Sequence, residues 1–150
     1  MKKILFILSI FIYTSSLAQT ESTFDEKLAK ELGADEYGMK TYVFCLLKTG
    51  TNTKATENEQ KIAFEGHMQN MNKLVKENKL IVAGPFYKNE RNYRGIFIFN
   101  CSTIEEAEEW VKTDPAIIAN LLEAELTLWY SSAALMKVDE IHDSIAKTKI

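Results

Sequence analysis

The 150-residue chain is poor in the residues that build metal centres, disulfide frameworks and linkers: it has two cysteines, two histidines, two prolines and six glycines. No cysteines or histidines stand at the CxxC or HxxxH spacing of a metal site, and no glycine-rich phosphate loop occurs. There is also no low-complexity tract and no internal repeat. These absences argue against a zinc domain, a P-loop nucleotide-binding protein and a repeat protein. The length suits one domain with its own core, and we expect neither a cofactor nor a metal.

Long hydrophobic runs are absent except at the N-terminus. Two lysines precede an apolar run from Ile4 to Tyr13, which is followed by small polar residues and Ser16-Leu17-Ala18. A basic start, a short apolar stretch and small residues before a cleavage point are typical of a secretory signal peptide, whereas a membrane-spanning helix needs about 20 apolar residues. We therefore expect residues 1–18 to be a signal peptide cleaved near Ala18. The mature protein would be periplasmic or secreted, without stable insertion into a membrane.

Positive charge is scarce once this leader is removed. The full chain has 18 Lys and Arg against 21 Asp and Glu, and loss of Lys2 and Lys3 leaves 16 against 21, a net charge of −5. Such a chain has no excess of basic side chains to bind phosphates, so a nucleic-acid partner is disfavoured.

The two cysteines would meet an oxidising compartment after export, which permits a disulfide. Both Cys45 and Cys101 lie in apolar, strand-like stretches, where cysteine is more often a small buried hydrophobe. Their strands would be antiparallel and would place them several residues out of register. We expect them to remain unbridged.

The spacing of apolar residues along the mature chain is typical of strands in some segments and of helices in others. Residues 19–36 contain a short amphipathic lead-in helix, with Thr23 and Glu26 at capping-box spacing and Gly33 as its stop. The pattern then predicts a strand at 41–48, a helix at 57–78, strands at 79–86 and 94–101, a helix at 104–112, a helical turn from Asp114-Pro115 and a strand at 123–130. A partly helical tail, 135–150, follows.

The order βαββαβ is that of the ferredoxin-like unit, an α+β fold with one antiparallel four-stranded sheet. Its first and third strands lie in the middle of the sheet, and here "YVFCLL" and "GIFIF" are apolar on both faces. The two helices cover one face. A second copy of the sheet, in a homodimer, is the favoured cover for the other face, and the alternative is that the C-terminal tail folds across it.

Several segments together resemble the YCII-related domain family, also called YciI-like proteins: "YGMKTYVFCLLKTG", "GHMQN", "KLIVAGPF", "RGIFIF", "EEAEEWVKTDPAI" and "EAELTLWY". The resemblance covers residues 37–134 and implies a dimeric α+β barrel of ferredoxin-like protomers. It also implies a pocket in which His67 and Asp114 face each other as an acid/base pair. A few relatives are cofactor-free lyases or dehydrochlorinases of small ring compounds, and muconolactone isomerases share the fold. Unlike many relatives, this chain has Leu128 and not proline before Trp129.

His67 lies on the apolar stripe of its helix, between Phe64 and Met71. The residues alone leave two interpretations open: a buried imidazole satisfied by one partner, or a group that transfers protons near neutral pH. Asp114 before Pro115 suits a helix N-cap as well as a carboxylate that orients the imidazole. We expect His67 to face a small polar pocket walled by core residues. Asp114 should be its partner, directly or through one water.

Other candidates for a ligand pocket are Phe86, Arg94 and Trp129. Arg94 could bind an anionic substrate or be a solvated turn residue, and the two aromatic residues could line a pocket or belong to the core. Gly66, inside a helix, indicates close approach by a loop or by a partner subunit, since glycine there costs about 1 kcal/mol relative to alanine.

The function expected from these residues and from the resemblance is that of a cofactor-free acid/base enzyme. It would be of lyase, isomerase or dehydrochlorinase type and would act on a small, aromatic or acidic molecule. The alternative is a non-catalytic dimer of the cell envelope, which is structural or binds a small ligand.

Overall fold

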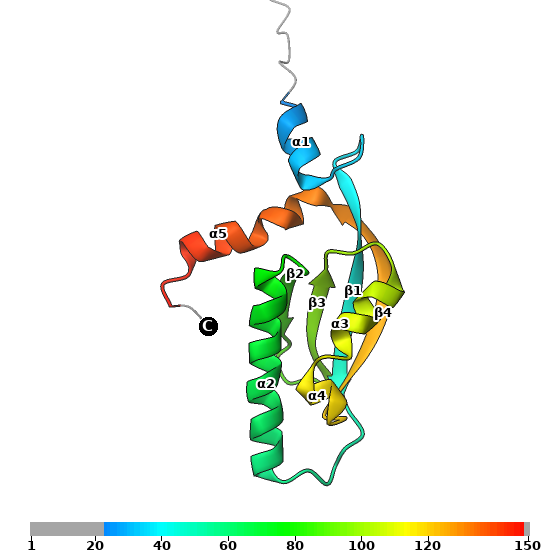
Figure 1. The fold of residues 1–150 in the computed structure, drawn as a ribbon, viewed down its shortest axis with the longest axis vertical. Helices are drawn as coiled ribbons and strands as arrows, with labels where there is room; N and C mark the ends of the chain where they lie inside the picture. Colours follow the sequence, from blue (N-terminus) through cyan, green and yellow to red (C-terminus); the bar gives the residue numbers. More distant parts are fainter. Residues whose placement is uncertain (1–22, 149–150) are drawn as a thin grey trace, which may run out of the picture.

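Four strands form one antiparallel sheet, which carries helices on one face in the computed structural model (Figure 1). The elements in chain order are α1 (Glu26–Leu32), β1 (Met39–Thr49), α2 (Glu57–Lys76), β2 (Leu80–Pro85), β3 (Tyr93–Phe99), α3 (Ile104–Val111), α4 (Pro115–Ile118), β4 (Leu122–Ser132), the 3-10 turn η1 (Ala133–Lys137) and α5 (Val138–Ile145). The structure describes residues 23–148, so the expected signal peptide lies outside the described residues. The strand order is β2-β3-β1-β4 with every neighbouring pair antiparallel, and the predicted α+β, ferredoxin-like topology is confirmed.

Side-chain caps mark where α1, α2, α3 and α4 begin. Thr56 and Glu59 form a capping box at the start of α2, in which the Thr56 N–H donates to Glu59 Oε2 over 2.7 Å. The capping box expected at Thr23 and Glu26 is wrong. Asp25 is the N-cap of α1, its backbone is extended, and its carboxylate accepts from the Leu28 N–H at 2.9 Å. Gly33 ends the helix as predicted, in the left-handed conformation at φ 69°.

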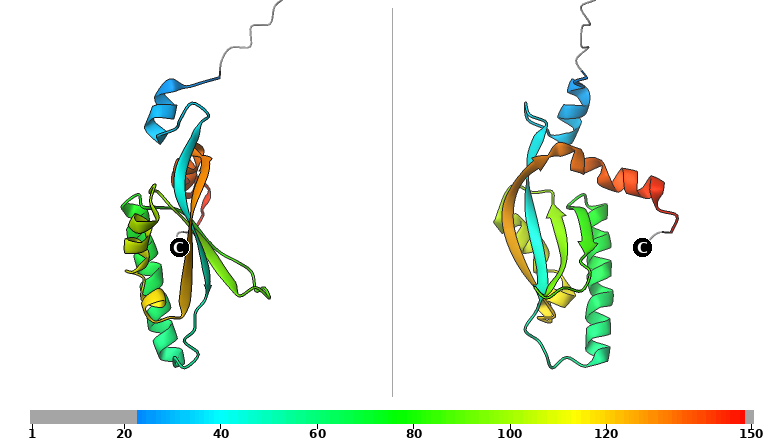
Figure 2. Two further views of the ribbon diagram at one scale, coloured as in Figure 1. Left: turned by 90° about the vertical axis from the view of Figure 1, so that its right-hand side faces the viewer. Right: turned by 180° about the vertical axis from the view of Figure 1, so that it is seen from behind.

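The helix-covered face of the sheet holds the main core. Figure 2 (left) shows α2, α3 and α4 on the same side of the strands. Buried side chains of β1 and β3 alternate toward these helices and pack with apolar residues of α2, α3, α4 and β4; they include Val43, Cys45, Leu47, Phe97 and Phe99. Cys45 lies opposite Phe97 in the sheet, and Cys101 comes four residues after Phe97, so the two cysteines are out of register. Both cysteines are free, which confirms that prediction.

The opposite face of the sheet is covered at one end only. Leu135 and Met136 of η1 pack on Tyr42, Ile81 and Ile98, which are buried there. Figure 2 (right) shows the C-terminal segment crossing that end. The tail, considered above as the alternative cover, therefore covers part of this face. The rest includes Trp129, which is 39% exposed, and the homodimer stays a prediction. None of the described helices is long and apolar enough to cross a bilayer.

Candidate acid/base site

The imidazole of His67 projects from α2 into the aromatic part of the core. Ala63, His67 and Leu74 are the buried positions of this helix, because their spacing places them on the side that faces the sheet. The ring of His67 stacks on Phe97 of β3, with centroids 5.7 Å apart and planes 22° apart. Phe64, one turn earlier, contacts the imidazole edge-on at 6.1 Å. These two rings set the plane of the imidazole.

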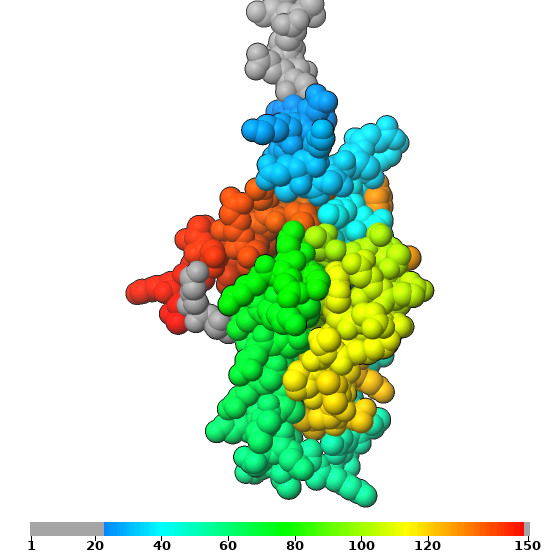
Figure 3. Space-filling model, in the orientation of Figure 1, coloured from blue at the N-terminus to red at the C-terminus, as the bar shows by residue number. Residues whose placement is uncertain are grey.

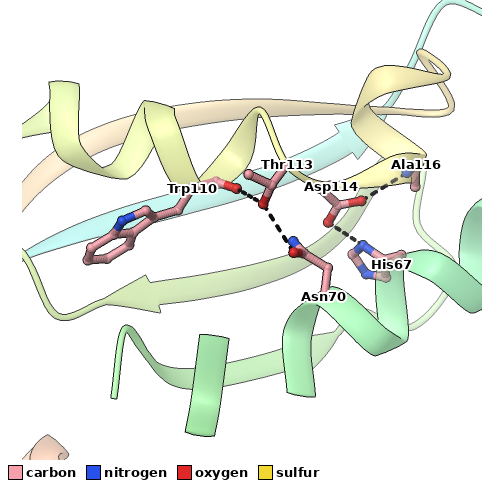
Figure 4. A network of polar contacts seen from close by, with 6 residues as sticks. All are labelled: His67, Asn70, Trp110, Thr113, Asp114 and Ala116. Carbon is pink, nitrogen blue, oxygen red and sulfur yellow. Dashed lines mark hydrogen bonds and ion pairs between the residues drawn. The ribbon is translucent and has the colours of Figure 1, made fainter. Parts of the chain in front are cut away.

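Asp114 does two things with its two oxygens. Oδ1 accepts a hydrogen bond from the Ala116 N–H at 2.9 Å and so caps α4, in which Pro115 is the first residue. Oδ2 lies 2.6 Å from Nδ1 of His67, and Figure 4 shows the two side chains pointing at each other across the gap between the helices. The capping interpretation and the pairing interpretation are therefore both correct, and the predicted contact between His67 and Asp114 is confirmed.

The pair is almost removed from water, since His67 is 9% and Asp114 1% exposed. A carboxylate only accepts hydrogen bonds, so Nδ1 of the imidazole is the donor in the 2.6 Å contact. Nε2 is then the free ring nitrogen. No side-chain nitrogen or oxygen among residues 23–148 is both buried and unpartnered, so Nε2, which bonds no described residue, reaches the solvent. A nitrogen of this kind can take or give a proton while the carboxylate stabilises the imidazolium.

Two further contacts flank the pair along the same helices. A Cβ on Gly66 would stand 2.7 Å from Cγ of Pro115, so Gly66 marks a close approach by the turn at α4. Oγ1 of Thr113 lies 3.1 Å from Oδ1 of Asn70, and it also donates to the Trp110 carbonyl at 2.6 Å. The Asn70–Thr113 contact was not predicted from the sequence. The only signals were the position of Asn70 three residues after His67 and the position of Thr113 directly before Asp114.

The other predicted pocket residues are placed differently. The guanidinium of Arg94 lies over the ring of Phe64 at 6.0 Å, so it is on the His67 side of the sheet. Phe86 is 45% exposed and packs on Tyr93 at 6.1 Å, whereas the ring neighbours of the imidazole within the described residues are Phe64 and Phe97.

Trp129 is not brought together with the pair. It stands opposite Tyr42 in the β1–β4 register and contacts the rings of Tyr42 and Phe44, on the face of the sheet away from the helices. Strand residues alternate between faces, so a side chain next to Tyr42 points away from Val43, Cys45 and the imidazole.

Two hollows occur elsewhere on the described surface. One, of about 260 Å³, lies between α3 and β4, and the other, of about 710 Å³, lies between α1 and the end of β4 with η1. His67 lines neither of them. The expected pocket walled by core residues is therefore not one of these hollows, and the space on two sides of the imidazole is filled by Phe64 and Phe97.

Cys45 lies near the pair, and its thiol is buried. Burial, and then the negative charge of Asp114, raise the pKa of its thiol to about 12. The thiolate, which is the reactive form, is therefore negligible at neutral pH. Within residues 23–148 no group of three or more His, Cys, Asp or Glu side chains could hold a metal ion.

Comparison with known protein families identifies the family of this chain. The family model described as YCII-related domain matches residues 42–129, which are 88 of the 150 residues. No curated protein matches the chain. Among solved structures, the chain is similar to 5-chloro-2-hydroxyhydroquinone dehydrochlorinase from Burkholderia phenoliruptrix AC1100 in complex with 2,5-dihydroxybenzoquinone. The two are 17% identical, with a TM-score of 0.42, over 58% of this chain and 92% of that chain.

Proposed function

The chain belongs to the YCII-related domain family, and from this premise we propose that it is a cofactor-free enzyme that moves a proton on a small molecule. His67 is the general acid or base, and Asp114 is the residue that orients it. The reaction is of lyase, isomerase or dehydrochlorinase type, and the substrate is aromatic or acidic. The proposal rests on one observation above all: the 2.6 Å contact between Nδ1 of His67 and Oδ2 of Asp114, which leaves Nε2 free and in reach of solvent.

The geometry supports a definite division of roles. The Ala116 N–H holds one carboxylate oxygen of Asp114, so the other stays aimed at Nδ1. When Nε2 takes a proton, the imidazole becomes a cation, and the adjacent carboxylate stabilises that charge without having to move. The stacked ring of Phe97 and the edge of Phe64 hold the imidazole plane during the transfer.

Arg94 is suited to stabilise the anion that such a proton transfer produces. A phenol or a carbon acid that loses a proton becomes an anion, and a guanidinium near the base stabilises that anion. Arg94 and His67 are both neighbours of the Phe64 ring, at 6.0 and 6.1 Å from its centroid. We therefore assign Arg94 to substrate binding, ahead of Phe86, and leave Trp129 out of the site within one protomer.

A second function is favoured by two observations: His67 lines neither hollow, and both oxygens of Asp114 are already engaged within the protomer. These features also suit a pair that holds α4 against α2 in a dimer that binds a small ligand without turnover, or that is purely structural.

One experiment separates the two functions. A thermal-shift screen of small aromatic acids, phenols and lactones identifies binders, because a ligand of the native state raises its stability by mass action. Each binder is then tested for turnover by the wild type, by His67→Ala and by the control His142→Ala, which alters the exposed second histidine in α5. An enzyme of the proposed kind shows pH-dependent turnover that is lost in His67→Ala and kept in His142→Ala. Binding without turnover supports the second function.

We also propose that the protein works as an exported homodimer. Export is supported by the leader pattern of residues 1–18, with a periplasmic or secreted destination. The dimer is supported by the sheet face away from the helices. Apolar β1 and β3 side chains lie on this face, the tail covers one end of it, and Trp129 remains partly exposed beside Phe44.

A further inference from the structure

We propose that Gly66 is a positioning residue that sets the length of the hydrogen bond between His67 and Asp114. The inference rests on the proposed function, because it concerns the same pair. Gly66 precedes His67 on α2, and Pro115 follows Asp114 at the start of α4, so the pair and this close approach are neighbours. Figure 3 shows α2 and the α3–α4 segment in contact over the front of the molecule.

Three successive contacts join the two segments: Gly66 with Pro115, His67 with Asp114, and Asn70 with Thr113. The two segments therefore run in opposite directions: the partners of Gly66, His67 and Asn70 are Pro115, Asp114 and Thr113. Of the three, the approach at Gly66 involves no polar group. Because Gly66 has no side chain to meet the ring of Pro115, the two segments can come close enough for Oδ2 of Asp114 to stand 2.6 Å from Nδ1 of His67.

Steric space is the reason for glycine at this position. Among the described glycines, Gly33 and Gly38 have positive φ and Gly66 does not, so its backbone is one that alanine could adopt. An added Cβ would stand 2.7 Å from Cγ and 3.1 Å from Cβ of Pro115, whereas ordinary contact begins near 3.4 Å. A change of ring pucker moves Cγ, but it does not relieve the contact with Cβ. The start of α4, with Asp114, and α2 must therefore separate by a few tenths of an ångström.

The test compares the imidazole of His67 in Gly66→Ala and in wild type by NMR of protein labelled with ¹⁵N-histidine. The chain has two histidines, so the exposed His142 is an internal reference in every spectrum. The chemical shifts of the two ring nitrogens report which of them carries the proton. The matched control is Gly84→Ala, since a Cβ at Gly84 meets no atom within 4 Å. The rescue variant is Gly66→Ala/Pro115→Ala, which removes the ring atom at 2.7 Å.

In wild type and Gly84→Ala we expect His67 to be held as the Nδ1–H tautomer, with an Nδ1 proton that exchanges slowly. In Gly66→Ala the tautomer should shift toward the mixture shown by His142, the proton should exchange faster, and the double variant should return part of the way. An unchanged His67 signal in Gly66→Ala would overturn the proposal, and so would a shift that the added Pro115→Ala does not reduce. If Gly66→Ala does not fold, a folded double variant whose His67 favours the Nδ1–H tautomer more than His142 does supports the proposal, and a double variant that also fails overturns it. The readout needs no turnover, so it separates a failure of this inference from a failure of the proposed function.

Discussion

Replacing Asp114 tests the site most directly, because the two oxygens of this residue have separable tasks. In Asp114→Ala, α4 loses its N-cap, which costs about 1 kcal/mol. The Nδ1–H of His67, in a residue only 9% exposed, loses its acceptor, which costs about 1–3 kcal/mol. The expected destabilisation is therefore about 2–4 kcal/mol, a large part of the roughly 5–15 kcal/mol that stabilises a typical domain.

Asp114→Asn is the matched variant, because the amide has nearly the same shape. Its oxygen can still accept from the Ala116 N–H, so the cap is kept. Its NH₂ group then faces Nδ1 of His67 and donates to it, which places the imidazole proton on Nε2. We expect a stability loss near 1 kcal/mol, together with loss of proton transfer, because Nε2 no longer has a free lone pair.

Urea unfolding of wild type, Asp114→Ala, His67→Ala and the double variant measures the coupling between the two side chains. His67→Ala leaves the carboxylate of Asp114 buried without its partner, which costs about 3–5 kcal/mol. Removing both side chains should therefore cost clearly less than the sum of the single losses. Additivity within about 0.5 kcal/mol would show that the 2.6 Å contact contributes no coupling, and the reasoning about the pair would fail.

Three further predictions concern the whole chain. Mass spectrometry of the exported protein should find a mature N-terminus near Gln19, and an intact Met1 in a membrane fraction would contradict cleavage. Light scattering at micromolar concentration should give twice the mass of the mature chain, and Trp129→Glu should lower it; a wild-type monomer would mean that the tail suffices to cover the second face. The third concerns alkaline pH. The pKa of Cys45 rises from its ordinary 9.0 to about 12 in the folded protein, so the unfolded thiol ionises first and stability falls as pH rises from 9 toward 12. The loss is up to about 1.4 kcal/mol per pH unit, and Cys45→Ala should lessen the slope measured by urea unfolding at several pH values; an equal slope in both proteins would refute the assignment.

The helices and strands were predictable from sequence because their signals are local. The apolar period located β1, α2, β2, β3, α3 and β4 to within two residues at each end. The first cap was placed wrongly because Thr23, Asp25 and Glu26 all carry side chains that can cap, and the spacing alone does not show which backbone is extended.

The pairing of His67 with Asp114 was a different kind of prediction. The two residues are 47 positions apart, and each has an ordinary local explanation, as a core histidine and as a helix cap. The contact was predicted because the resemblance to the YCII-related domain family supplied a relation between distant residues that no local pattern contains. Its catalytic use stays a proposal.

The sequence by itself determined the order of elements and the two-faced apolar character of β1 and β3, since both follow from spacing along the chain. Only the tertiary structure decided which side chains share the site. Alternation shows that neighbouring strand residues point to opposite faces, but it does not show which face the helices cover. Nor does it reveal an irregular register: β1 pairs Leu47 with Gly95 and Lys48 with Tyr93, so Arg94 between them is free to reach the helix side. Packing across the sheet, and not the local pattern, placed the Arg94 guanidinium over the ring of Phe64 and Trp129 on the other face of the sheet.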